Sequence, residues 1–135
     1  MGSNQCNHRG TEAQSFDVSE LTIGAAIEVH RELGPGLLEA AYEAALCAEF
    51  ALRGIQFRRQ IEMPIVYKGV PLAQSYRVDL IVEESLVLEL KAVERLEAVH
   101  TAQLLTYLKL LNLPTGLLIN FNCAQLRQGL KRVAL

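Results

Sequence analysis

The N-terminal third of the chain carries apolar residues at helical spacing in two successive segments. Asp17 and Glu20 form a capping box that would begin a helix. The apolar positions that follow fall on one helical face, at Leu21, Ala25, Val29 and Leu33. Gly34-Pro35-Gly36 ends this helix. Because proline suits the first turn of a helix, we predict that a second helix runs from about residue 35 to residue 52. It would close at Gly54, and Glu39 would lie one turn inside it.

From Ile55 to Val93 the pattern changes to β-branched and aromatic residues with turn punctuation. It predicts strands over residues 56–67, 72–83 and 86–92. Lys68-Gly69 and residues 83–85 are short connections, so these three strands should be antiparallel hairpin partners.

Helical spacing returns over residues 95–112 and ends before Pro114. Residues 116–121 then predict a short buried strand, which the helical crossover can place parallel to the third strand. A short basic tail from Gln125 is expected to be helical. The predicted fold class is α/β, in the order α-β-β-β-α-β, with a mixed central sheet flanked by helices.

Length and composition fit one folded domain. The chain has 135 residues, half of them hydrophobic, which is enough to bury a core. Residues 1–15 are polar without apolar period and predict a disordered lead, so the single domain is expected over residues 16–135. No segment approaches the roughly 20 apolar residues of a membrane span, and no signal peptide is evident, so we expect a cytoplasmic protein. The odd, widely spaced cysteines, at positions 6, 47 and 123, argue against a disulfide framework or zinc knuckle.

The charge balance limits how the chain could bind nucleic acid. The net charge is −2 and the isoelectric point is about 5.9, which argues against a strong nonspecific grip on phosphates by the whole domain. Phosphate contacts would have to be local. Two small basic groups exist, and either could simply be a solvated face: Arg58 with Arg59, and Arg127 with Lys131 and Arg132.

Three charged residues interrupt the apolar runs of the second and third predicted strands. Asp79 shares a face with Arg77 on one strand, and Glu89 shares a face with Lys91 on the next. Two carboxylates on neighbouring strands suit a hard divalent ion, with the backbone carbonyl of Leu90 as a further ligand. An ammonium beside that ion could orient or deprotonate the attacking water, which is the arrangement for metal-assisted phosphodiester hydrolysis. The alternative is a structural salt bridge from Lys91 to one of the acids at a sheet edge.

The helix after the third strand adds polar side chains. Gln103 and Tyr107 are four residues apart on one face, with His100 on the same side. The amide and the phenol could hydrogen-bond a phosphate, the attacking water or a flipped base. The alternative is an ordinary polar stripe on a helix.

With these residues in view, the chain resembles a known family. The stretch Gly34-Pro-Gly-Leu-Leu-Glu39-Ala-Ala-Tyr42 is similar to the defining motif of the small bacterial GxxExxY proteins, which are assigned to the PD-(D/E)XK nuclease superfamily. The resemblance runs from about Leu21 to Phe121 and implies a restriction-endonuclease-like core. In the superfamily's pattern the helical acid corresponds to Glu39, the metal-binding acid to Asp79, and the E-x-K pair to Glu89 and Lys91. Gln103 and Tyr107 match the Q-x-x-x-Y signature of its RecB-like branch.

The resemblance also bears on two other side chains. RecB-like nucleases place a metal-binding histidine before the sheet, but Glu39 already fills the motif, and His30 is expected to be a hydrogen-bonded core or rim residue. Tyr42 is expected to orient its helix rather than perform chemistry.

Taken together, these features predict a nuclease that uses Mg²⁺ or Mn²⁺ on nucleic acid, with DNA favoured over RNA. Asp79 and Glu89 would hold the metal, Glu39 would bind a second ion or bridge through water, and Lys91 would serve the water. A homodimer or a partner protein would supply affinity. Two alternatives stay open. One is a noncatalytic nucleic-acid-binding or protein-interaction module with the same fold, and the other is a structural subunit with an exposed apolar surface on residues 104–111.

Overall fold

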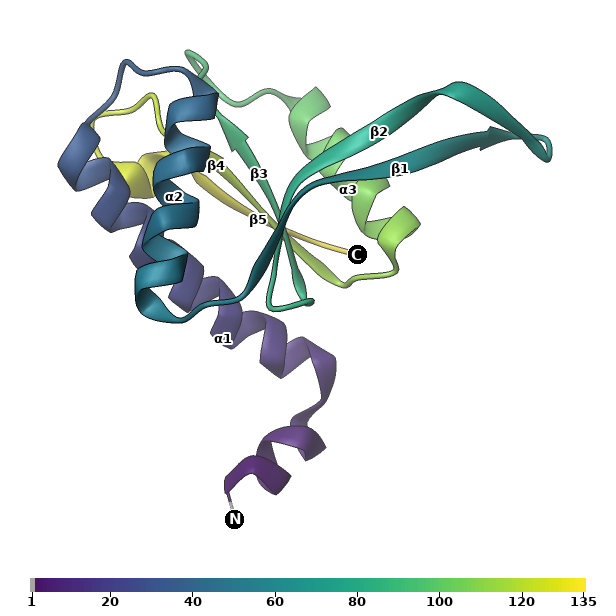
Figure 1. Ribbon diagram of the computed structural model, residues 1–135, viewed down its shortest axis with the longest axis horizontal. Helices are drawn as coiled ribbons and strands as arrows, with labels where there is room; N and C mark the ends of the chain where they lie inside the picture. The colour runs from purple at the N-terminus through teal and green to yellow at the C-terminus, as the bar shows by residue number, and fades with distance from the viewer. Residues whose placement is uncertain (1) are drawn as a thin grey trace.

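A computed structural model describes the backbone of residues 2–135 and the side chains of residues 18–135. The side chains of residues 1–17 are not described, so the predicted lead over residues 1–15 stays a prediction. The backbone of the first helix is described from Gly2, so the prediction that this helix begins at the Asp17–Glu20 capping box was wrong. The elements in chain order are α1 (Gly2–Leu33), α2 (Glu39–Arg53), β1 (Phe57–Tyr67), β2 (Val70–Val82), β3 (Leu86–Lys91), α3 (Ala98–Leu111), β4 (Thr115–Asn120), the 3₁₀ turn η1 (Leu126–Gly129) and β5 (Leu130–Ala134) (Figure 1).

The strands within this described range form one mixed sheet in the order β1-β2-β3-β4-β5. β1–β2 and β2–β3 are antiparallel hairpins, and β3–β4 is a parallel pair joined through α3. The predicted fold class, an α/β mixed sheet flanked by helices, is therefore confirmed. Its three hairpin strands and the parallel crossover strand lie close to the predicted ranges.

The prediction for the C-terminal tail was wrong. Only residues 126–129 form a helical turn, and Leu130–Ala134 is a strand that pairs antiparallel with β4. Val133 is buried beneath α3, while the adjacent Lys131 and Arg132 are both exposed, so the strand does not show a regular alternation of buried and exposed residues. Five residues with one buried apolar position give a weak period. The backbone hydrogen bonds to β4 stabilise this strand although its sequence has little strand pattern. They also cover the edge of β4, which would otherwise be open.

The start of the second helix also differs from the prediction. α2 begins at Glu39, so this residue lies at the helix N-terminus and not one turn inside it. Gly34 and Gly36 adopt positive φ angles of 68° and 105°, which hold the chain in an irregular loop. The hydroxyl of Tyr42 donates to the Gly34 carbonyl at 2.5 Å and accepts from the Leu37 N–H at 3.1 Å. Tyr42 therefore ties the loop to its helix, and Gly54 closes α2 in the left-handed conformation as predicted.

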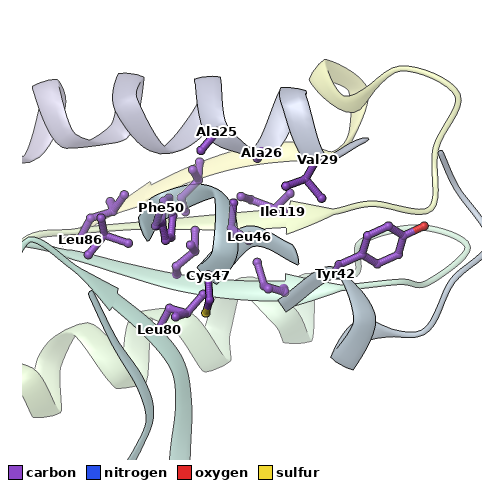
Figure 2. Close-up of a cluster of buried hydrophobic side chains, with 14 of the residues drawn as sticks. Ala25, Ala26, Val29, Tyr42, Leu46, Cys47, Phe50, Leu80, Leu86 and Ile119 are labelled. Atoms are coloured by element: carbon purple, nitrogen blue, oxygen red, sulfur yellow. The ribbon is translucent and has the colours of Figure 1, made fainter. Parts of the chain in front are cut away.

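Helices cover both faces of the sheet. α1 and α2 pack on one face and α3 packs on the other (Figure 1). Figure 2 shows the larger core, where Leu46 and Phe50 of α2 meet the sheet and the ring of Tyr42 closes one end. That ring stacks on Phe121 with centroids 4.5 Å apart. The core therefore fixes the end of α2 that carries Glu39.

β1 and β2 continue well beyond the rest of the sheet as a two-stranded arm (Figure 1). The two strands pair from Phe57 with Val82 out to Tyr67 with Val70, whereas β3 pairs with β2 only over Leu80–Val82. The arm therefore leaves the sheet at Asp79.

Candidate active site

The hydrogen-bond ladder between β2 and β3 stops at the pair Leu80–Leu88. In the same register the next residues outward are Asp79 and Glu89, which face each other across the gap. Here the carboxylates replace the ladder. Oε2 of Glu89 accepts the Asp79 N–H at 2.9 Å, and Oδ2 of Asp79 accepts the Leu90 N–H at 2.9 Å. Each acid is thus held by the backbone of the opposite strand.

Asp79 is also unpaired on its other side. β1 pairs Arg59 with Leu80 and Ile61 with Val78, but it skips the intervening position. That position is Gln60, whose φ of 51° lies in the left-handed region that non-glycine residues rarely adopt. The local break in β1 lies directly opposite Asp79. Because of this break, Asp79 has no ladder partner on β1, just as it has none on β3.

Burial and like charge make the two carboxylates unusual acids. Glu89 is only 4% exposed, and its burial, followed by the charge of Asp79, raises its pKa to about 8. Burial also raises the pKa of Asp79, and the carboxylates of Glu43 and Glu39 add to the rise, although the Leu90 N–H and Lys91 oppose it. A cation between Asp79 and Glu89 would offset both the cost of burying their charges and the repulsion between them.

Lys91 ends β3, two residues beyond Glu89 and on the same side of the strand. Its charge lowers the pKa of both Asp79 and Glu89, so the ammonium lies within electrostatic reach of the pair. None of the ion pairs among residues 18–135 includes Lys91. Within these residues, Lys91 therefore forms no salt bridge with Asp79 or Glu89, in contrast to the structural alternative.

Glu39 reaches the same region from the N-terminus of α2. Its Oε2 accepts the N–H of Ala92, the residue after β3, at 3.3 Å. Its charge raises the pKa of both strand acids. The Gly34–Leu38 loop and the Tyr42 clamp therefore deliver a third carboxylate to the open end of the β2–β3 ladder.

Glu43 is a site residue that the sequence interpretation missed. It lies one turn after Glu39 on α2, is 8% exposed, and raises the pKa of Asp79. The amide of Gln60 donates to its two oxygens at 2.8 and 3.0 Å, and Arg59 Nε donates at 3.1 Å. Glu43 thereby fixes the break in β1 opposite Asp79. The four-residue spacing from Glu39 was the available signal.

The polar face of α3 divides into two parts. Tyr107 is 3% exposed, and its burial, with the charges of Glu89 and Asp79, raises its pKa to about 12. It stays protonated and lies within electrostatic reach of both acids. Gln103 is exposed on α3 without a described contact to them. His100 Nδ1 accepts the Glu97 N–H at 2.9 Å and so caps the helix.

Two other residues singled out by sequence have structural partners. His30 is 8% exposed and donates from Nε2 to the Cys123 carbonyl at 2.8 Å, which agrees with the expectation of a hydrogen-bonded rim residue. Of the basic residues, Arg58 pairs with Glu84 and Arg132 with Glu20. At least one member of each basic group therefore lies in a surface ion pair.

The acids can be tested for their fit to a divalent ion. Among the described residues, no three His, Cys, Asp or Glu side chains are placed as a ready metal cluster. Mg²⁺, however, is usually held by one or two carboxylates, with waters and substrate phosphate completing its shell. Oδ1 of Asp79 and Oε1 of Glu89 accept no hydrogen bond within residues 18–135. This oxygen-only pair with raised pKa values fits such an ion.

Comparison with known proteins adds one match. A family model described as the PD-(D/E)XK nuclease superfamily matches residues 16–133. Comparisons with curated proteins and with solved structures give no match. The matched range includes every acid at the open end of the β2–β3 ladder.

Proposed function

The chain belongs to the PD-(D/E)XK nuclease superfamily, and from this premise we propose that it is a metal-dependent nuclease that hydrolyses phosphodiester bonds of nucleic acid. The observation that carries the proposal is the opening of the β2–β3 ladder at Asp79 and Glu89. Two carboxylates at a strand break, each held by a backbone N–H, are positioned before any ligand arrives.

Asp79 and Glu89 are the proposed ligands of a single Mg²⁺ or Mn²⁺ ion. Such an ion, when bound, supplies Lewis-acid chemistry by lowering the pKa of water and neutralising phosphate charge. A role for the Leu90 carbonyl as a further ligand stays part of the proposal. Glu39 would bind a second ion or hold a bridging water, since it reaches the site from α2.

Lys91 is proposed to orient the attacking water, and its ammonium charge helps that water lose a proton to solvent. The water oxygen bonds to phosphorus while the bond from phosphorus to the leaving oxygen breaks, the leaving oxygen takes a proton from solvent, and the ammonium balances charge on the phosphate. Tyr107 keeps its proton near Glu89 and can donate a hydrogen bond to a phosphate oxygen. Gln103, one turn earlier on the same helix, would position the substrate strand.

The finer assignment is to the GxxExxY proteins, on the motif from Gly36 through Glu39 to Tyr42. The clamp formed by Tyr42 gives that motif a physical reason, because it sets where the helix carrying Glu39 begins. Under this assignment the substrate is nucleic acid, with DNA favoured. A homodimer or partner protein supplies affinity to a chain whose net charge is −2. In the described part of the chain, no helix is both long and apolar enough to cross a membrane. A cytoplasmic location remains part of the proposal.

The proposal is tested with purified protein, Mn²⁺ and plasmid DNA or a single-stranded RNA. Wild type should cut the nucleic acid, and Lys91→Ala should abolish the cut. Lys109→Ala, an exposed lysine on α3, is the matched control and should leave cleavage unchanged. Equal activity in wild type and Lys91→Ala would refute the assignment.

The competing function is a noncatalytic binding module with the same fold, which the low net basicity favours modestly. Manganese titration separates the two. A nuclease should gain thermal stability on metal binding, whereas a module with an idle pocket should not. The structural-subunit alternative expected an exposed apolar surface on residues 104–111. Leu104 and Leu108 are instead buried against the sheet, and Leu110 is the one large apolar side chain of that stretch among the exposed described residues.

A further inference from the structure

A pocket of about 320 Å³ lies between the β1–β2 arm and α3, outside the group of acids. One wall is Tyr76 of β2, and the rest comes from the first turns of α3. The full lining is Tyr76, Val99, His100, Ala102, Gln103 and Thr106.

The pocket adjoins the proposed reaction site through two aromatic side chains. Tyr76 contacts Tyr107 edge to face, with ring centroids 5.7 Å apart. Tyr107 in turn lies within electrostatic reach of Glu89 and Asp79. Tyr76 also precedes Asp79 by three residues on the same strand. A nucleic acid strand with its phosphate at the acids would therefore place a neighbouring nucleotide at the pocket.

The lining has the chemistry of a site for a flat, neutral ligand. It contains no Asp, Glu, Lys or Arg side chain, so it offers no full charge to a phosphate. Because Nδ1 of His100 accepts the Glu97 N–H, the proton of the neutral ring lies on Nε2, which is left as a donor. Gln103 adds an amide that both donates and accepts, while Tyr76 and Val99 supply an aromatic surface and an apolar one. Stacking with edge hydrogen bonds is how proteins hold unpaired bases.

We propose that this pocket is a subsite for an unpaired nucleobase next to the phosphate that is attacked. Tyr76 stacks on the base, and His100 with Gln103 contacts its edge. A base inside a duplex cannot enter without leaving its stack, so the protein should favour single-stranded over double-stranded nucleic acid. This inference rests on the proposed function, because the acids define which phosphate lies beside the pocket.

The test measures binding, separately from cleavage, by fluorescence anisotropy of a labelled single-stranded 12-mer DNA and its duplex in Mn²⁺. Every protein carries Lys91→Ala, so that the probe stays intact. Adding Tyr76→Leu should weaken single-strand binding on the order of tenfold, as expected for the loss of one base–aromatic stack. Duplex binding should change little. Tyr76→Phe should behave as the parent, and Tyr67→Leu at the exposed arm tip should do so too.

A series of 12-mers with one abasic position each sharpens the result. In the parent one position should cost most of the affinity, and Tyr76→Leu should remove that dependence. Single-strand affinity that is unchanged by Tyr76→Leu, or that falls equally for the duplex, would overturn the subsite. Failure of the nuclease proposal is distinct, because it would appear as absence of cleavage by wild type while the base-dependent binding persisted.

Discussion

The two halves of the β2–β3 pair differ completely although they are consecutive in sequence. From Leu80 to Val82 the strands pair backbone to backbone, and their side chains are fully buried and apolar. One residue further, at Asp79 and Glu89, carboxylates take the hydrogen bonds that a ladder would make. The closed half supplies burial, which stabilises the fold, and the open half concentrates charge, which opposes it.

This contrast places the buried apolar pairs that stabilise the fold next to the acids of the proposed metal site. The closed half should tolerate loss of volume poorly and should not affect the reaction directly. The open half should show the reverse, because functional sites often retain groups that destabilise the free protein.

Replacing Glu89 by glutamine should reduce nuclease activity by about a hundredfold to a thousandfold, since it removes a proposed metal ligand. The same change should raise the melting temperature in EDTA, because a neutral amide avoids the burial and like-charge cost that lifts the pKa of Glu89. Thermal melts and cleavage rates measure the two effects. Glu94→Gln, an exposed glutamate, is the control. If Glu89→Gln were less stable than wild type and fully active, the contrast between the open and closed halves would be wrong.

Leu88→Ala in the closed half should cost about 2–5 kcal/mol of unfolding free energy, as for other fully buried leucines. Urea denaturation measures this cost. The exposed Leu110→Ala should change the free energy by about 0.5 kcal/mol or less. If both variants unfold at the same urea concentration, the closed half is not the stabilising part.

Tyr42→Phe should destabilise the protein by about 1–2 kcal/mol, since it removes the hydroxyl that accepts from Leu37 and donates to Gly34. The ring and its stack on Phe121 remain, so the core should be retained. Activity should also fall, because the start of the helix carrying Glu39 is no longer fixed. Urea midpoints and cleavage rates give both readouts. If Tyr42→Phe lost stability but kept full activity, the hydrogen bonds of the Tyr42 hydroxyl would not be needed to position Glu39.

The last prediction concerns the dependence of stability on pH. The folded-state pKa of Glu89, about 8, lies above its ordinary value of 4.5, so the folded protein binds more protons than the unfolded chain between these values. This contribution is fully present below about 4.5 and is lost as the pH rises through about 8. Asp79 shifts in the same direction. In EDTA the melting temperature should therefore decline over this range, less steeply in Glu89→Gln, and an identical slope in both proteins would contradict the assignment.

The sequence predicted the strands and the strand acids because both depend on local pattern. β-branched runs between turn residues define β1, β2 and β3, and Asp79 and Glu89 are conspicuous because they interrupt apolar strands. Their facing positions follow from hairpin register. The superfamily motif then added Glu39, which lies far away in the chain.

Other features depend on contacts between distant segments. Glu43 is an ordinary helical glutamate until Gln60 and Arg59 of β1 reach it. The late start of α2 depends on a tyrosine hydroxyl binding back to a glycine carbonyl, which overrides the preference of proline for a first helical turn. Strand β5 requires the edge of β4. Such long-range pairings leave little trace in local periodicity.

The most direct test is a crystal structure of the wild-type protein grown with Mn²⁺, with anomalous scattering used to locate the ion. We predict an anomalous peak between the free oxygens of Asp79 and Glu89, and no such peak in Glu89→Gln. An ion bound elsewhere, or no ion in wild type at millimolar manganese, would contradict the claim that the open end of the β2–β3 ladder is a metal centre.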